Sequence, residues 1–181
     1  YVKAILGSGG KAFIIDSGRS YENLCKILDG EYIDFEEGNT ICLNPFTTIL
    51  EEPVAGGINF SEQLPLLKSL IATMASPFEQ LSSKHLALLE DAIYKAWSNY
   101  GQTTTITLVQ KALRKSLEQE SKDIAIMLTP YCAGGAYEQY FEGEGNINFK
   151  KSFVVLELEA LNAKPDLQTV VLFLLMKRIT E

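Results

Sequence analysis

The sequence predicts an α/β domain whose parallel sheet is interrupted by an all-α insertion. Three short segments have the pattern of strands, namely 12–15, 32–35 and 153–156, and the first and the last are continuous apolar runs, as buried parallel strands are. From residue 58 to residue 138, apolar residues recur instead at helical spacing. Because strand–helix units flank this helical block, we expect residues 1–54 and 150–181 to form the sheet domain and residues 58–138 a helical subdomain.

The N-terminal stretch GSGGKAFIIDSGRSY (7–21) looks at first like a phosphate-binding loop, but it does not fit that motif. A P-loop reads G-x-x-x-x-G-K-[ST] and follows a buried strand. Here alanine follows the lysine, and the six residues before Gly7 have the apolar spacing of a helix end. We therefore expect Gly7 to follow a helix in the left-handed conformation, and Lys11–Ile15 to form the first strand.

The loop after this strand contains the two candidate site residues. Asp16 ends the strand, where ligands of open α/β sheets bind, so it is expected near a nucleotide or a subunit interface. The alternative for Asp16 is a turn or helix-cap role. Arg19 is a long cation that could contact a phosphate, including one on a neighbouring subunit, and the alternative is an exposed loop arginine. Ser20 is expected to cap a helix over Tyr21–Leu28.

The helical block has clear boundaries. Asn59, with a glutamate three residues later, predicts a capped helix start. A second amphipathic helix is predicted over Leu86–Tyr100. We expect Trp97, Tyr94 and Tyr100 to belong to the core of the insertion, with a face that docks a partner as the alternative.

The C-terminal segment returns to the strand–helix pattern. Pro165 and Asp166 suit the first turn of a helix that is expected over Leu167–Glu181 and is apolar almost all round, so it should be buried. The chain starts and stops within stretches that read as helices. We therefore expect it to be a piece of a longer protein.

The composition is that of a globular protein, and it limits the possible ligands. The 181 residues are 46% apolar and 22% charged, with a formal net charge of −7. This acidic balance argues against nucleic acid as the dominant ligand of the surface. The three cysteines form no C-x-x-C pair, so neither a zinc site nor a disulfide framework is predicted. A loose group of acids lacks the spacing of a metal site, and its members are Glu142, Glu144, Glu157 and Glu159.

Several sequence stretches together resemble one protein family. They are IIDSGRSY (14–21), GEYIDF (30–35), LNPF (43–46), PY (130–131), GGAYEQYFEG (134–143), the strand 153–159 and the helix 165–181. Their order and spacing resemble the C-terminal ATPase domain of the large type IV secretion ATPases, the TraC/TrbE-like conjugative-transfer family. The resemblance covers essentially the whole chain.

The resemblance implies a partial P-loop NTPase (RecA-like) fold. In this family the phosphate-binding loop (Walker A) precedes the helix that ends at Leu6, and the Walker B strand follows Glu181, so this chain resembles the segment between them. The full-length protein is expected to bind ATP and Mg²⁺ and to hydrolyse ATP to energise type IV secretion or conjugative DNA transfer. The segment alone is expected to bind no cofactor and to be inactive, and none of its residues is assigned a catalytic or metal-binding role.

The resemblance also implies an assembly and a location. The full-length protein is expected to form a ring of six subunits with nucleotide between them, on the cytoplasmic side of the inner membrane and attached to it through other secretion components. Contact with nucleic acid is left open. An alternative function also stays open, a non-catalytic α/β interaction module with a helical docking subdomain. A G-x-x-x-x-G-K-[ST] motif upstream in the coding sequence would distinguish the two.

Overall fold

The computed structural model describes residues 1–36, 38–49, 59–147, 149 and 151–180. Three strands form a parallel sheet in the order β1-β3-β2, and they are β1 (Ala12–Asp16), β2 (Glu31–Asp34) and β3 (Phe153–Glu157). The α/β class expected from the sequence is confirmed. The predicted boundaries at residues 54, 58 and 150 and the predicted helix end at Glu181 lie outside the described residues.

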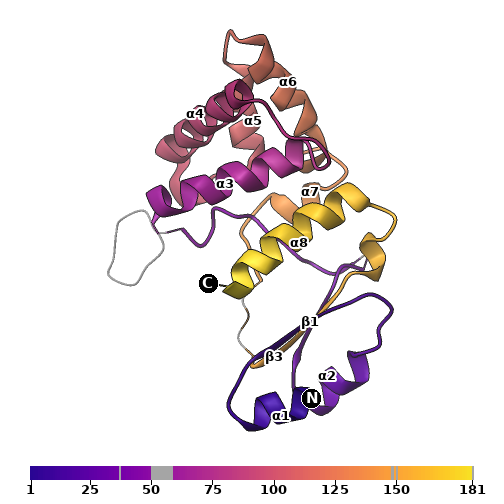
Figure 1. The fold of residues 1–181 in the computed structure, drawn as a ribbon. Coiled ribbons are helices and arrows are strands. Elements are labelled where there is room, and N and C mark those ends of the chain that lie inside the picture. Colours follow the sequence, from indigo (N-terminus) through magenta and orange to yellow (C-terminus); the bar gives the residue numbers. More distant parts are fainter. Residues whose placement is uncertain (37, 50–58, 148, 150, 181) are drawn as a thin grey trace.

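Helices cover both faces of the sheet (Figure 1). Helices α1 (Val2–Gly7) and α2 (Glu22–Ile27) lie on one face, and α8 (Pro165–Thr180) lies on the other. Successive β3 residues alternate between two clusters of buried side chains: Phe153 and Val155 pack with α1 and α2, whereas Val154 and Leu156 pack on the α8 side. Burial on both faces explains why the strand is a continuous apolar run.

Between β2 and β3, all the regular elements described from residue 60 to residue 147 are helices. Its helices are α3 (Phe60–Ala75), α4 (Ser83–Tyr100), α5 (Ile106–Arg114), α6 (Gln119–Met127) and α7 (Glu138–Phe141), with short 3₁₀ turns at Gly101–Thr103 and Thr129–Tyr131. Asn59 caps α3 as predicted, because its side-chain oxygen accepts a hydrogen bond from the Glu62 N–H at 3.0 Å. Within the described ranges, no helix has the length and apolarity needed to cross a membrane.

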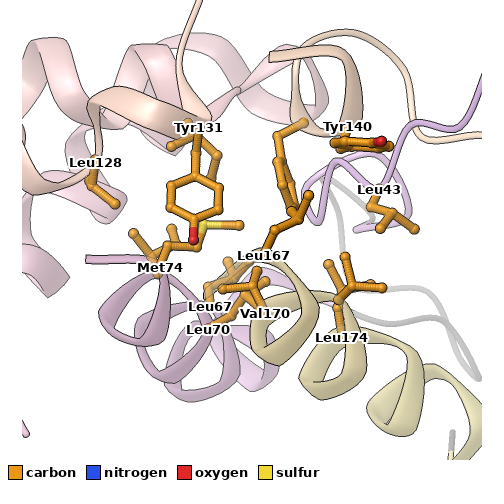
Figure 2. Close-up of a cluster of buried hydrophobic side chains, with 14 of the residues drawn as sticks. Leu43, Leu67, Leu70, Met74, Leu128, Tyr131, Tyr140, Leu167, Val170 and Leu174 are labelled. Atoms are coloured by element: carbon orange, nitrogen blue, oxygen red, sulfur yellow. The ribbon is translucent and has the colours of Figure 1, made fainter. Parts of the chain in front are cut away.

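One hydrophobic core joins the sheet to the helices. Figure 2 shows α3 packing against α8, with side chains from the loop before α3 and from the 129–141 region closing the cluster. The buried residues labelled there are Leu43, Leu67, Leu70, Met74, Leu128, Tyr131, Tyr140, Leu167, Val170 and Leu174. The core continues from there to Val154 and Leu156 of β3, so α8 is the layer between the sheet and the helical segment.

The N-terminal glycines end a helix, as expected, but the residue in the left-handed conformation differs from the predicted one. Gly7 is the last residue of α1, and Gly9 has the positive φ of 80°. The N–H of Ser8, the C-cap residue, still donates to the Ala4 carbonyl at 3.1 Å, so the helical hydrogen-bond pattern continues to Ser8 before the chain reverses.

The expected burial of Tyr94 and Tyr100 is wrong. Their exposed fractions are 56% and 48%, whereas Trp97 is half-buried and stacks on Phe60 with a ring separation of 4.8 Å. The buried face of α4 is occupied by smaller and aliphatic side chains, namely Leu89, Ala92, Ile93 and Ala96. The tyrosines fall outside this face because a helix turns only one stripe toward the core.

Candidate functional site

Three carboxylates lie side by side at the carboxyl edge of the sheet. Asp16, Glu157 and Asp34 are each the last residue of their strand, and the register pairs Glu157 with both aspartates. Residues of one register row point to one face, which here is the α1/α2 face, since Phe153 and Val155 also point there. This edge is where ligands of open α/β sheets bind.

Glu157 is the centre of this row and is only 2% exposed. One carboxylate oxygen, Oε1, accepts hydrogen bonds from the N–H groups of Gly18 (3.1 Å) and Glu159 (2.9 Å), and the other, Oε2, accepts from Arg19 N–H (2.7 Å) and the Tyr32 hydroxyl (3.4 Å). Burial raises the pKa of this carboxyl, but the hydrogen bonds outweigh burial and the net pKa is lowered. Glu157 is therefore an ionised anchor for the loop that follows β1.

Asp16 holds the same loop from its other end. Its Oδ1 accepts from Ser17 N–H and its Oδ2 from Tyr21 N–H, both at 3.0 Å. The expected capping by Ser20 is wrong, because α2 begins at Glu22 without a side-chain cap and the Asp16 carboxylate takes the backbone donor nearest the helix start. These contacts are those of a turn residue, and the proximity of Asp16 to a nucleotide stays a prediction.

Arg19 occupies a left-handed backbone conformation with φ of 57°, directly after Gly18. Its side chain is 39% exposed and forms ion pairs with Glu36, Glu22 (4.0 Å) and Glu159 (3.8 Å). The charge of Glu36 is the main reason that the pKa of the guanidinium is raised. The structure thus places Arg19 at the carboxyl edge beside Asp16 and surrounds it with carboxylates.

Two further residues fix this edge. Asn162 donates from Nδ2 to the Ser17 hydroxyl at 3.0 Å and accepts from Gln168 of α8 at 3.1 Å, so the loop is tied to the helix on the opposite face. Burial, helped by the nearby charge of Glu157, raises the pKa of Tyr32 to about 12, so its hydroxyl stays a donor at neutral pH. Among the residues described at this edge, the carboxylates of Asp16 and Glu157 are bound by neighbouring N–H and hydroxyl groups, and the Arg19 guanidinium stays partly open to solvent.

The sequence pattern did not single out Glu157. It was placed in a loose acidic group with Glu142, but Glu142 lies in the helical segment, where it accepts from the Thr107 N–H at 3.1 Å and the Thr107 hydroxyl at 2.7 Å. A usable signal existed, because Glu157 closes an apolar strand in the same way as Asp16.

The described residues do not by themselves fit a Mg²⁺ site. Asp16 and Glu157 direct their oxygens at backbone N–H groups, which compete with a cation for the same lone pairs. In the part of the chain that the structure describes, no three His, Cys, Asp or Glu side chains converge as metal ligands. No chemical step through a metal is therefore assigned to these residues.

Comparison with known proteins gives consistent relatives. The model of the TraG P-loop domain family matches residues 1–181. Protein TraC of Escherichia coli (strain K12) is 28% identical over 187 residues, an alignment that covers 97% of this chain and 20% of TraC. The chain thus spans a fifth of the length of this relative.

The fold has a solved counterpart. The structure of VirB4 of Thermoanaerobacter pseudethanolicus matches with a TM-score of 0.75 at 20% identity, over 97% of this chain and 71% of the VirB4 chain. At this identity the match shows a shared fold. The resemblance drawn from the sequence stretches is confirmed by these matches, and the chain belongs to the TraG P-loop domain family.

Proposed function

We propose that this chain is a segment of an ATPase that energises type IV secretion or conjugative transfer, and that its carboxyl edge contributes to nucleotide-dependent contacts between subunits. The observation that carries the proposal is the loop from Asp16 to Tyr21, which two buried carboxylates fix at the ligand-binding edge of a P-loop-type sheet. The 181 residues contain no G-x-x-x-x-G-K-[ST] motif. We assign binding of ATP and Mg²⁺ to other regions of the full-length protein.

The role proposed for Arg19 is contact with a phosphate, most simply one held by a neighbouring subunit. Its present partners, Glu36, Glu22 and Glu159, are all at least one-quarter exposed, so the guanidinium can exchange a carboxylate for a phosphate oxygen. Hydrogen bonds from a guanidinium to a carboxylate and to a phosphate are both charge-assisted and similar in geometry, so the guanidinium would keep an anionic partner after the exchange. This role accords with a ring, with six subunits as the expected number, located at the cytoplasmic side of the inner membrane.

We propose different roles for the sheet and for the helical part of the chain. Residues 1–54 and 150–181 would supply the nucleotide-proximal sheet, and residues 58–138 a helical subdomain available to other components of the secretion system.

The proposal is tested by comparing ATP hydrolysis by the full-length protein and by the 181-residue chain at equal molar concentration with Mg²⁺. We expect hydrolysis by the full-length protein, its loss on chelation of Mg²⁺, and none by the chain, because a phosphate cradle and a Walker B acid are both needed. Hydrolysis by the chain alone would contradict the proposed division of the site. An inactive full-length protein would favour the non-catalytic interaction module.

A further inference from the structure

A hollow of about 570 Å³ lies between α4 and α5, in the helical segment and remote from the carboxyl edge of the sheet (Figure 1). Four cationic side chains line it: Lys95 from α4, and Lys111, Arg114 and Lys115 from the end of α5. Asp91 is the one carboxylate in the same lining. The hollow is therefore basic, although the whole chain carries a net charge of −7.

Most of this positive charge is not neutralised locally. Lys95 pairs with Asp91 at 2.6 Å, one helical turn away. Lys111, Arg114 and Lys115 form no ion pair with any residue that the structure describes. The negative end of the α5 dipole favours cations in its last turn, but it does not explain why Lys95 of another helix lies at the same hollow. Converging unpaired cations are the usual footprint of an anionic ligand.

An exposed aromatic ring lies beside these cations. Tyr100, the last residue of α4, is 48% exposed and lines the hollow together with Asn99. The same two residues also line an adjoining hollow that contains Tyr94 and Trp97. Cations next to solvent-accessible aromatic faces are the combination that binds single-stranded nucleic acids, since phosphates pair with the cations and bases stack on the rings.

We propose that the hollow between α4 and α5 binds single-stranded nucleic acid, with phosphates on Lys111, Arg114 and Lys115 and a base stacked on Tyr100. In a duplex the bases stack on one another and are not available to the tyrosine. An acidic protein segment would neutralise the cations but would leave the aromatic ring without a matching group. The acidic remainder of the surface restricts binding to this basic hollow.

The test is fluorescence anisotropy with a fluorescein-labelled oligothymidylate of about 20 nucleotides, which exceeds the site size of most single-strand binding folds. We expect the triple variant Lys111→Gln, Arg114→Gln, Lys115→Gln to bind at least about tenfold more weakly. It should also reduce the slope of log affinity against log salt concentration by about 2, since three phosphate contacts are lost. The matched control, Lys3→Gln, Lys11→Gln, Lys26→Gln, removes the same charge from the α1/α2 end of the molecule and should bind like the wild type.

The stacking contact is tested separately at Tyr100. Tyr100→Ala should weaken binding about tenfold with an unchanged salt slope, and Tyr100→Phe should retain the wild-type affinity, because stacking needs only the ring. Thermal melting checks that each variant is folded. If the triple variant is unfolded, the two Tyr100 variants still test the proposal. The proposal would be overturned if both triple variants lost the same affinity for the oligothymidylate, or if Tyr100→Ala bound it like the wild type. Equally tight binding of duplex DNA or of polyglutamate would also overturn it, and binding of polyglutamate would identify an acidic protein as the partner.

Discussion

The loop that carries Arg19 depends on a single buried carboxylate. Glu157 binds the backbone N–H groups of Gly18, Arg19 and Glu159, none of which belongs to a strand of the sheet. A hydrogen bond to a charged group contributes about 1.5–3 kcal/mol, and a buried donor left without an acceptor costs a similar amount. The conformation of this loop is therefore more sensitive to the charge of Glu157 than to its size.

We predict that Glu157→Gln lowers the free energy of unfolding at pH 7 by about 2–3 kcal/mol, because the amide replaces an acceptor with a donor that faces backbone N–H groups. The pKa of Glu157 is lowered in the folded protein. Its ionisation thus stabilises the fold above the unfolded-state pKa of about 4.3, and that contribution is lost as the pH falls through the folded pKa.

Urea denaturation of the wild type and Glu157→Gln between pH 7 and pH 3 measures this difference. The difference in free energy of unfolding between the two proteins should become smaller below about pH 4. Exposed Glu144, changed to Gln, is the control and should change the free energy of unfolding by less than about 0.5 kcal/mol. A gap that is constant with pH would show that the charge of Glu157 is not what holds the loop.

The residue patterns predicted part of this site. Asp16 and Arg19 were expected at one sheet edge and lie there, because parallel strands deliver their carboxyl ends to the same side. The ion pairs of Arg19 could not be predicted, since Glu36 and Glu159 reach it only after three separate segments of the chain are folded together. The hydrogen bond from Tyr21 N–H to Asp16, which replaces the expected cap by Ser20, could not be predicted either, because its two residues lie five positions apart in an irregular loop.

At the scale of elements, Asn44 in the segment LNPF (43–46) connects the chain that follows β2 to two distant parts of the helical segment. This side chain is 1% exposed and donates from Nδ2 to the carbonyls of Thr104 (3.0 Å) and Gly143 (2.7 Å), while its Oδ1 accepts from Phe46 N–H (3.0 Å). The Asn44-Pro45 pair is typical of a turn, but the sequence pattern does not indicate the two distant carbonyls, because local patterns report only neighbouring residues.

We predict that Asn44→Ala lowers the free energy of unfolding by about 2–4 kcal/mol, because two carbonyls and one N–H group lose their partner in a buried site. Asn99 is the matched control: it is exposed and its Nδ2 also donates to a carbonyl, that of Lys95, at 2.6 Å. Asn99→Ala should cost less than about 0.5 kcal/mol. Chemical denaturation measures both variants, and similar values for the two would refute the connecting role of Asn44.

Helix periodicity was a more reliable guide than single breaking residues. The capping pattern at Asn59 and the helical apolar spacing after it predicted a helix here, and α3 forms although Pro65 lies inside it. A proline in a helix interior removes one backbone hydrogen bond, but burial of Leu67, Leu70 and Ile71 on the same helix offsets that loss. The proline itself is exposed, so its ring meets no core side chain.

At the scale of the whole molecule, the central strand comes from the far end of the chain. β3 lies between β1 and β2, so the two N-terminal strands are adjacent in sequence but do not pair. Composition and periodicity predicted a parallel sheet and a helical block. They could not give the strand order, because the pairing partners of an apolar strand are set by packing against α8 and the helical segment.

This topology puts the Arg19 loop and Lys11 at opposite edges of the sheet. Lys11 immediately precedes β1 and is exposed, whereas Arg19 follows β1 at the carboxyl edge. Both are long cations on the same strand–loop unit, and only Arg19 is at the edge where a nucleotide is expected. Lys11 is therefore the natural control for any function assigned to Arg19.

The most direct measurement is steady-state ATP hydrolysis by the full-length protein carrying Arg19→Ala or Lys11→Ala, together with the melting temperature of the 181-residue chain carrying each change. We predict that Arg19→Ala lowers the rate of hydrolysis by at least about tenfold, as expected for an arginine that stabilises a transferring phosphate. Lys11→Ala should leave the rate unchanged, and neither change should alter the melting temperature appreciably. A wild-type rate of hydrolysis in the full-length Arg19→Ala variant would contradict a functional role for this edge. So would an Arg19→Ala change that unfolds the 181-residue chain but leaves hydrolysis by the full-length protein unchanged.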